Sequence, residues 1–167
     1  SSLVFRLIKS KCKVLRVMSN DENGLYELSK EIIKKFTINH DLFINQMGKN
    51  RIRFFLGDVR DKIRCDEVTK NVDIVIHAAA IKHVNISEYN KREAIKTNYE
   101  GTKNLLKASI KNNVSKFIFI STDKVVSPTN IMGKSKQLAE NFVINSENLI
   151  GKNKLKVSSI RFGILSP

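Results

Sequence analysis

Short apolar segments alternate with longer amphipathic stretches along the chain, and this alternation restricts the fold more than any other feature. The clearest apolar segments are "VDIVIHAAA" at 72–80 and "KFIFIS" at 116–121. Continuous apolar runs of this length are typical of strands buried on both faces, which occur in parallel sheets. Because helical stretches separate the strands, the sequence predicts an α/β fold with three layers around a parallel sheet.

The expected elements fill most of the 167 residues, a length that suits one domain with its own core. Apolar residues at helical spacing identify the helices, as in the series Leu25, Leu28, Ile32 and Phe36. The predicted strands are 13–18, 52–56, 73–78, 116–121 and 157–161, and the predicted helices are 2–10, 23–36, 91–112 and 129–147.

The composition argues against several other kinds of protein. The formal net charge is +14, but the lysines are scattered and no basic stripe is interleaved with aromatic residues. We therefore expect no nucleic-acid partner, although the positive field suits a phosphorylated small molecule. No apolar run approaches the roughly 20 residues that cross a bilayer, so any membrane anchor is expected outside this segment. Cys12 and Cys65 lack metal-ligand spacing, which predicts free thiols, a cytoplasmic location and no metal site.

Polar and small residues gather where the predicted strands end. Ligands bind at the carboxyl ends of the strands in open α/β sheets, so these positions are candidate site residues. Each has an ordinary alternative, with Asp58 and Asp123 as helix caps and His83 as a surface residue. Their coincidence at three strand ends favours a binding site. The candidates are Asp58 after one strand, Ala78, Ala79, Ala80, Lys82 and His83 after the next, and Ser121, Thr122, Asp123 and Lys124 after the third.

Two further polar residues occupy the apolar faces of predicted helices. Lys136 lies in a stripe with Met132 and Ala139, and Asn98 lies in the stripe of the 91–112 helix. A buried lysine needs a partner or a ligand, because an unpaired buried charge is costly. Two alternatives stay open: Lys136 extends along the surface to solvent, and Asn98 simply bonds a neighbouring carbonyl.

Several segments occur in an order and at a spacing that resemble the extended short-chain dehydrogenases acting on nucleotide sugars. More narrowly, the chain is similar to the nucleotide-sugar 4,6-dehydratases of bacterial polysaccharide and glycan biosynthesis, of the UDP-N-acetylglucosamine 4,6-dehydratase type. The resemblance runs from Lys13 to Gly163. The segments that carry it are "GDVRD", "VIHAAAIKHV", "EAIKTNYEGTKNLL", "ISTDKVVSPTNIMGKSKQLAE" and "SSIRFG".

The resemblance implies a lyase that oxidises the sugar at C4, removes water across C5 and C6, and returns the hydride to C6. It implies that Asp123 protonates the leaving C6 hydroxyl and that Lys124 takes the C5 proton. Thr122 is expected to bond the C4 oxygen, and Lys136 to bind the nicotinamide ribose and favour the C4 alkoxide.

One position departs from most of that superfamily. Met132 stands where the tyrosine of the Tyr-x-x-x-Lys pair is usual, four residues before Lys136. A thioether cannot handle the proton that a phenol transfers. The large, often membrane-anchored dehydratases of the subgroup are similar to this chain in having Met there. The acid and the base are therefore expected in the segment Thr122, Asp123 and Lys124.

The same resemblance implies a nicotinamide cofactor. An acidic residue at the tip of the second strand usually binds the NAD ribose, but this chain has Ser19 and Asn20 there. That difference favours NADP over NAD, unless Asn20 only shapes the turn. The expected substrate contacts are Lys82, His83 and Thr122. The expected cofactor contacts are Ser19, Asn20, Asp58, Val59, Ala78, Ala79, Ala80, Lys82, Asn98, Ser121 and Lys136.

Both ends depart from the family pattern. The chain starts after the place of the glycine-rich loop that holds the pyrophosphate, and Ile164 replaces the Asn of the family's "RFGN". Residues 1–167 are therefore expected to be a partial NAD(P)-binding Rossmann-like domain, inactive by itself. The complete enzyme is expected to be a homo-oligomer with a UDP-sugar substrate. An inactive nucleotide-binding scaffold and a nucleotide-sugar epimerase are the alternatives.

Overall fold

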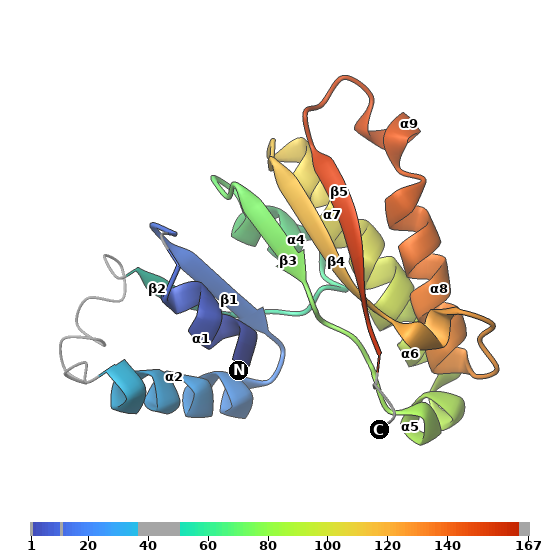
Figure 1. Cartoon of the computed structure of the whole chain (residues 1–167), viewed down its shortest axis with the longest axis horizontal. Coiled ribbons are helices and arrows are strands. Elements are labelled where there is room, and N and C mark those ends of the chain that lie inside the picture. Colours follow the sequence, from blue (N-terminus) through green and yellow to red (C-terminus); the bar gives the residue numbers. More distant parts are fainter. Residues whose placement is uncertain (1, 11, 37–50, 164–167) are drawn as a thin grey trace. The chain divides into compact units, whose positions relative to one another are not determined.

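The computed structural model describes residues 2–10, 12–36 and 51–163, which belong to two compact units divided between Asp58 and Val59. Figure 1 colours the first unit from blue to teal and the second from teal through green and yellow to red. All strand pairs in both units are parallel, with the order β1-β2 in one sheet and β3-β4-β5 in the other. The predicted parallel α/β fold is therefore confirmed.

The first unit contains α1 (Ser2–Ile8), β1 (Leu15–Ser19), α2 (Glu22–Phe36) and β2 (Ile52–Leu56). Its core is formed by Ile8, Ile32 and Ile52, which are all buried. The rings of Phe5 and Phe36 stack at the edge of this cluster with their centroids 6.4 Å apart. The two helices thus bury apolar residues together with β2, and for residues 23–36 the helical spacing predicted this.

The second unit is built on a three-stranded sheet. Its strands are β3 (Ile74–His77), β4 (Lys116–Thr122) and β5 (Lys156–Phe162). Its helices are α4 (Lys62–Thr69), α5 (Val84–Tyr89), α6 (Lys91–Ile95), a π-helical turn η1 (Lys96–Glu100), α7 (Gly101–Lys111), a 3-10 turn η2 (Asp123–Val125), α8 (Ile131–Ile144) and α9 (Glu147–Ile150). Figure 1 shows α7 and α8 beside the sheet, and α8 packs on β4 and β5.

Alternate residues of β4 are buried, namely Phe117, Phe119 and Ser121. Their register pairs Phe119 with His77 of β3 and Ser159 of β5. The same sheet face therefore changes from apolar to polar toward the carboxyl ends of the strands. This gradient places polar groups under α8 at the end where the sequence predicts a site.

Two helix predictions need correction. The predicted helix 91–112 is interrupted by the π turn at Lys96–Glu100, and the predicted helix 129–147 is shorter, from Ile131 to Ile144. The helix α4 was not predicted because its sequence, KIRCDEVT, mixes charged and apolar residues without a clear stripe. Asp61 caps it by accepting hydrogen bonds from Ile63 N and Arg64 N, at 2.8 and 3.0 Å. Within the described ranges, no helix combines the length and apolar character that crossing a membrane requires.

Candidate functional site

Three successive residues at the end of β4 carry a hydroxyl, a carboxylate and an ammonium group. Thr122 Oγ1 donates a hydrogen bond to Asp123 Oδ1 at 2.9 Å and accepts one from Lys124 N at 3.4 Å. This hydrogen bond to Thr122 caps the 3-10 turn, and the chain turns away from the sheet immediately after Thr122. The side chains of Asp123 and Lys124 are exposed. The three side chains can therefore meet a ligand from solvent.

Lys136 lies on the inner face of α8 and is buried, with 5% of its surface exposed. Its Nζ donates a hydrogen bond to the carbonyl oxygen of Ile120 at 2.6 Å and lies 4.0 Å from the centroid of the Phe119 ring. Burial lowers the pKa of this amine from 10.5 to about 8, and the charge of Glu140 acts in the opposite direction. The side chain therefore does not reach along the surface to solvent, which was the alternative left open by its sequence position.

The start of α8 packs closely against the Asp123–Val125 turn. Asn130 caps the helix by accepting a hydrogen bond from Gly133 N at 2.8 Å. A Cβ atom on Gly133 would lie 2.7 Å from the carbonyl oxygen of Lys124 and 3.0 Å from Pro128 Cβ. Met132, where the superfamily has tyrosine, is buried with 4% of its surface exposed. The glycine thus lets the helix approach the turn that carries Lys124.

We expect Gly133→Ala to lower the free energy of unfolding by roughly 1–3 kcal/mol, because the new methyl group collides with the carbonyl oxygen of Lys124 and crowds Pro128. Denaturant unfolding monitored by circular dichroism measures this loss. Lys134→Ala is the matched control, since Lys134 is the next helical residue and is exposed. Equal free energies of unfolding for the two variants would show that the Asp123–Val125 turn can move to accommodate the methyl group without loss of stability.

Asn98 ties the loop after β3 to α8. Its Oδ1 accepts a hydrogen bond from Ile81 N at 2.8 Å, and its Nδ2 donates to Ile81 O at 3.1 Å and to Ser135 Oγ at 2.9 Å. Asn98 lies within the π turn and is 1% exposed. The alternative that Asn98 bonds a neighbouring carbonyl is correct, but the residue also bonds an N–H and a hydroxyl. π turns occur often at functional sites.

His77, the last residue of β3, is a part of this region that the sequence analysis missed. It is 2% exposed, lies beside the rings of Phe117 and Phe119, and its Nε2 is 2.8 Å from Thr102 Oγ1. Thr102 Oγ1 donates to Asn98 O, so it accepts its second hydrogen bond from the histidine. Burial, together with the charge of Lys136, lowers the pKa of His77 to about 3.

The lowered pKa of His77 predicts acid sensitivity. Between about pH 6.5 and about pH 3 the unfolded chain binds a proton that the folded chain does not bind. Stability is therefore lost as the pH falls through this window, at up to about 1.4 kcal/mol per pH unit. His77→Gln should flatten the unfolding free energy between pH 6.5 and 4, whereas His83→Gln, at an exposed histidine, should leave the slope unchanged. Parallel slopes in both variants would show that another group causes the acid sensitivity.

The remaining predicted site residues lie in two places. In the second unit, Ala78, Ala79, Lys82 and His83 are exposed in or next to the loop after β3, with Ala80 half-buried there and Val59 buried near α4. His83 precedes α5, and its carbonyl accepts a hydrogen bond from Ser87 Oγ at 2.8 Å. Ser19, Asn20 and Asp58 belong to the first unit, where Ser19 O accepts a hydrogen bond from Gly57 N at 2.9 Å. Ile164 lies outside the described residues.

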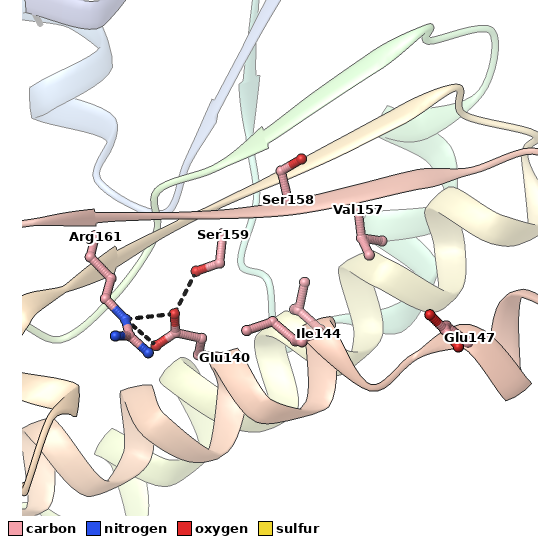
Figure 2. A pocket seen from close by; sticks show the side chains of 8 residues that line it. Glu140, Ile144, Glu147, Val157, Ser158, Ser159 and Arg161 are labelled. Atoms are coloured by element: carbon pink, nitrogen blue, oxygen red, sulfur yellow. Dashed lines mark hydrogen bonds and ion pairs between the residues drawn. The ribbon is translucent and has the colours of Figure 1, made fainter.

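Glu140 is the second residue that the sequence analysis missed. Its carboxylate is 3% exposed and lies one helical turn after Lys136 on α8. It accepts hydrogen bonds from Ser121 Oγ at 3.1 Å, Ser159 Oγ at 2.9 Å and Arg161 Nε at 3.0 Å. Figure 2 shows the Ser159 and Arg161 contacts, beside a cavity of about 600 Å³ between α8 and β5. The position of Glu140 four residues after Lys136, on the same face of the helix, is the sequence signal that could have revealed it.

A nicotinamide cofactor fits the residues at the carboxyl ends of β3 and β4. Ala78 and Ala79 are exposed and carry only methyl groups, so a flat ligand can approach the main chain there. Asn98 fixes that main chain at Ile81, and the Lys136 ammonium group lies at Ile120 on the neighbouring strand. In the first unit, Ser19 and Asn20 lie at the tip of β1, where a ribose is bound in folds of this type.

The family model described as polysaccharide biosynthesis protein matches residues 1–165. The chain belongs to this family. It is 43% identical over 161 residues to an uncharacterized membrane protein of Methanocaldococcus jannaschii, covering 96% of this chain and 44% of that protein. It is 38% identical over 141 residues to the UDP-N-acetylglucosamine 4,6-dehydratase (inverting) of Campylobacter jejuni, covering 84% of this chain and 41% of the enzyme.

The chain is also similar to an epimerase and to solved structures. The UDP-glucose 4-epimerase of Rickettsia canadensis is 42% identical over 117 residues, covering 70% of this chain and 34% of that protein. Among solved structures, Pen from Bacillus thuringiensis superposes with a TM-score of 0.85 at 35% identity, covering 96% of this chain and 45% of that one. This polysaccharide biosynthesis chain thus spans less than half the length of the relatives that it matches.

Proposed function

We propose that the protein containing this chain is a nucleotide-sugar 4,6-dehydratase that converts UDP-N-acetylglucosamine to a UDP-4-keto-6-deoxy sugar. The observation that carries the proposal is the grouping of Thr122, Asp123 and Lys124 at the exposed end of β4. The similarity to the Campylobacter jejuni dehydratase supports the choice of substrate. Membership in the polysaccharide biosynthesis family supports a role in making a sugar precursor for such polymers.

The elimination step needs an acid and a base on the same small region of the sugar. Lys124 would remove the proton from C5, and Asp123 would give a proton to the C6 hydroxyl, which leaves as water. Thr122 would hydrogen-bond the C4 oxygen, which must be a carbonyl for the C5 proton to be acidic. Asp123 and Lys124 are adjacent and both exposed, so they can approach one substrate together.

A bound nicotinamide cofactor would supply the remaining chemistry by accepting a hydride from C4 and returning it to C6. Lys136 would bind its ribose, and Asn98 would hold the loop after β3 against it. Ser19 and Asn20 at the tip of β1 favour NADP over NAD, since neither carries the carboxylate that usually binds the NAD ribose. Fluorescence titration of the whole protein with NADPH and NADH compares the two affinities.

A second candidate, a nucleotide-sugar 4-epimerase, is favoured by the identity to the Rickettsia canadensis enzyme. Epimerisation also begins with oxidation at C4 but retains the C6 hydroxyl. It needs no acid on C6 and no base at C5. The pair Asp123 and Lys124 therefore favours dehydration over epimerisation.

The deciding experiment is to incubate the whole protein with UDP-N-acetylglucosamine and NADP or NAD, and to follow the sugar by NMR and mass spectrometry. A dehydratase yields a product that has lost one water and carries a methyl group at C6. An epimerase yields an isomer of unchanged mass. Nucleotide binding without conversion of any sugar would support an inactive Rossmann scaffold.

We further propose that the protein works as a homo-oligomer and that this segment lies in the cytoplasm.

A further inference from the structure

We propose that Glu140 is a positioning residue whose carboxylate holds α8 against the ends of β4 and β5 and so fixes where Lys136 lies. The inference deepens the proposed function, since it concerns the same lysine. It rests on the buried Glu140 carboxylate, which accepts hydrogen bonds from two strands. The chemistry proposed for Lys136 and for Thr122–Lys124 assigns no role to this carboxylate. Figure 2 shows how Ser159 and Arg161 point at Glu140 from β5.

Lys136 and Glu140 contact consecutive residues at the end of β4. Lys136 donates to the carbonyl of Ile120, and Glu140 accepts from the side chain of Ser121, the next residue. The residue after Ser121 is Thr122, where the proposed acid–base segment begins. Two successive turns of α8 are thus attached to two successive residues of β4. A shift of α8 along β4 would break both contacts.

Residues of β5, in addition to Ser121 of β4, hold the Glu140 carboxylate. Ser159 Oγ donates to Glu140 Oε1 at 2.9 Å and Ser121 Oγ donates to Oε2 at 3.1 Å. Arg161 Nε donates to both oxygens, to Oε1 at 3.0 Å and to Oε2 at 3.3 Å. The carboxylate plane is therefore held between the two strands. Glu140 is 3% exposed while the Arg161 side chain is 52% exposed, so the cation balances the buried charge from the solvent side. Burying a carboxylate is tolerated only with such partners.

Glu140 also acts on Lys136 through its charge. Two titratable groups on neighbouring elements interact with the Lys136 ammonium through charge: Glu140 on α8 raises the pKa of Lys136, and Lys136 lowers the pKa of His77 on β3. Arg161 on β5 forms an ion pair with Glu140. Burial lowers the pKa of Lys136, and Glu140 opposes that effect. Removing the negative charge therefore shifts the titration of Lys136 to lower pH. A residue that only joined two elements would leave this titration unchanged.

The test compares Glu140→Gln with Glu147→Gln in the whole protein. Glu147 lines the same cavity but is exposed, so its substitution makes the same chemical change outside the hydrogen-bonded group. NMR of the Lys136 Cε group follows its titration, and steady-state kinetics give kcat and KM. We expect Glu140→Gln to move the titration midpoint downward and to lower kcat roughly 10-fold to 100-fold, since a small displacement of a positioned group has effects of this size. Glu147→Gln should change neither quantity.

Milder variants keep the proposal testable if Glu140→Gln does not fold. Ser121→Ala removes the link to β4 and Ser159→Ala removes one link to β5. We expect the first to lower kcat more than the second, and Glu140→Asp, which keeps the charge, to restore the Lys136 titration toward that of the wild type. A folded Glu140→Gln variant with unchanged kcat and unchanged Lys136 titration would overturn the proposal. If the wild type converts no sugar, the proposed function fails, and the titration alone decides this inference.

Discussion

Replacing Asp123 by Asn in the whole protein should lower the rate of sugar dehydration by roughly 10²–10⁴-fold, and replacing Lys124 by Ala should do the same. Each substitution removes a group that would transfer a proton during the elimination. Both side chains are exposed at the end of β4, so neither loss removes core packing. The measurement is steady-state turnover of UDP-N-acetylglucosamine, with unfolding curves to confirm that both variants remain folded.

Met132→Leu is the matched comparison at the position where the superfamily has tyrosine. The side chain is 4% exposed and the exchange conserves volume, so we expect a stability loss below about 1.5 kcal/mol and a minor change in rate. Near-normal turnover in Asp123→Asn and Lys124→Ala would place the chemistry elsewhere. A loss in Met132→Leu as large as that in Asp123→Asn would show that the thioether position takes part.

Lys136→Met should have opposite effects on activity and on stability. We expect the rate to fall at least about 100-fold, because the ammonium group that would bind the cofactor ribose and favour the C4 alkoxide is lost. We also expect the free energy of unfolding at pH 7 to rise by about 1–3 kcal/mol. A pKa lowered from 10.5 to about 8 means that the charged form is disfavoured in the folded protein, and Met carries no charge into the same space.

The pH dependence of stability separates this explanation from simple repacking. Between about pH 8 and pH 10.5 the unfolded wild type binds a proton at this lysine that the folded protein has released, so wild-type stability should increase with pH. Lys136→Met should lack this increase. A variant that is less stable than the wild type at every pH would show that the bond to Ile120 outweighs the cost of burying the charge.

Much of the fold could be predicted because short apolar runs alternate with amphipathic stretches, a pattern typical of parallel α/β sheets. The expected burial on both strand faces is not what the structure shows, since in β4 only the face of Phe117, Phe119 and Ser121 is buried. The ends of an apolar run are marked by the polar residues that flank it, and β4 was predicted to within one residue of its observed end. The helix α4 escaped prediction because its apolar residues form no stripe, so its position depends on contacts with α7 that no local pattern encodes. Local pattern identifies what is buried, whereas tertiary contacts decide where an irregular segment becomes helical.

The candidate site divides in the same way. The place of Thr122–Lys124 at a strand end and of Lys136 on the apolar face of its helix follow from local pattern. The burial of Lys136 did not follow, because the same pattern allows the side chain to extend to solvent. The partners of Lys136 were not predictable, because Ile120 contributes a main-chain carbonyl and Phe119 contributes a ring face. Glu140 was not among the candidates from the sequence, because helical acids are usually exposed. Its burial depends on Ser159 and Arg161, which arrive from β5 about twenty residues later.

The π turn at Lys96–Glu100 has a consequence for the insertions and deletions that this segment can accept during evolution. Successive residues of a regular helix are rotated by about 100°, so one extra residue shifts the phase of everything after it. The turn absorbs such a residue, and the helix can present Asn98 to the β3 loop while Leu105 and Leu106 stay buried further along. Loss of a single codon within Lys96–Glu100 would therefore restore a regular helix and retain its core, yet detach the loop. Insertions and deletions at this turn, more than substitutions in the core, are the changes by which a lineage could lose the site while keeping the fold.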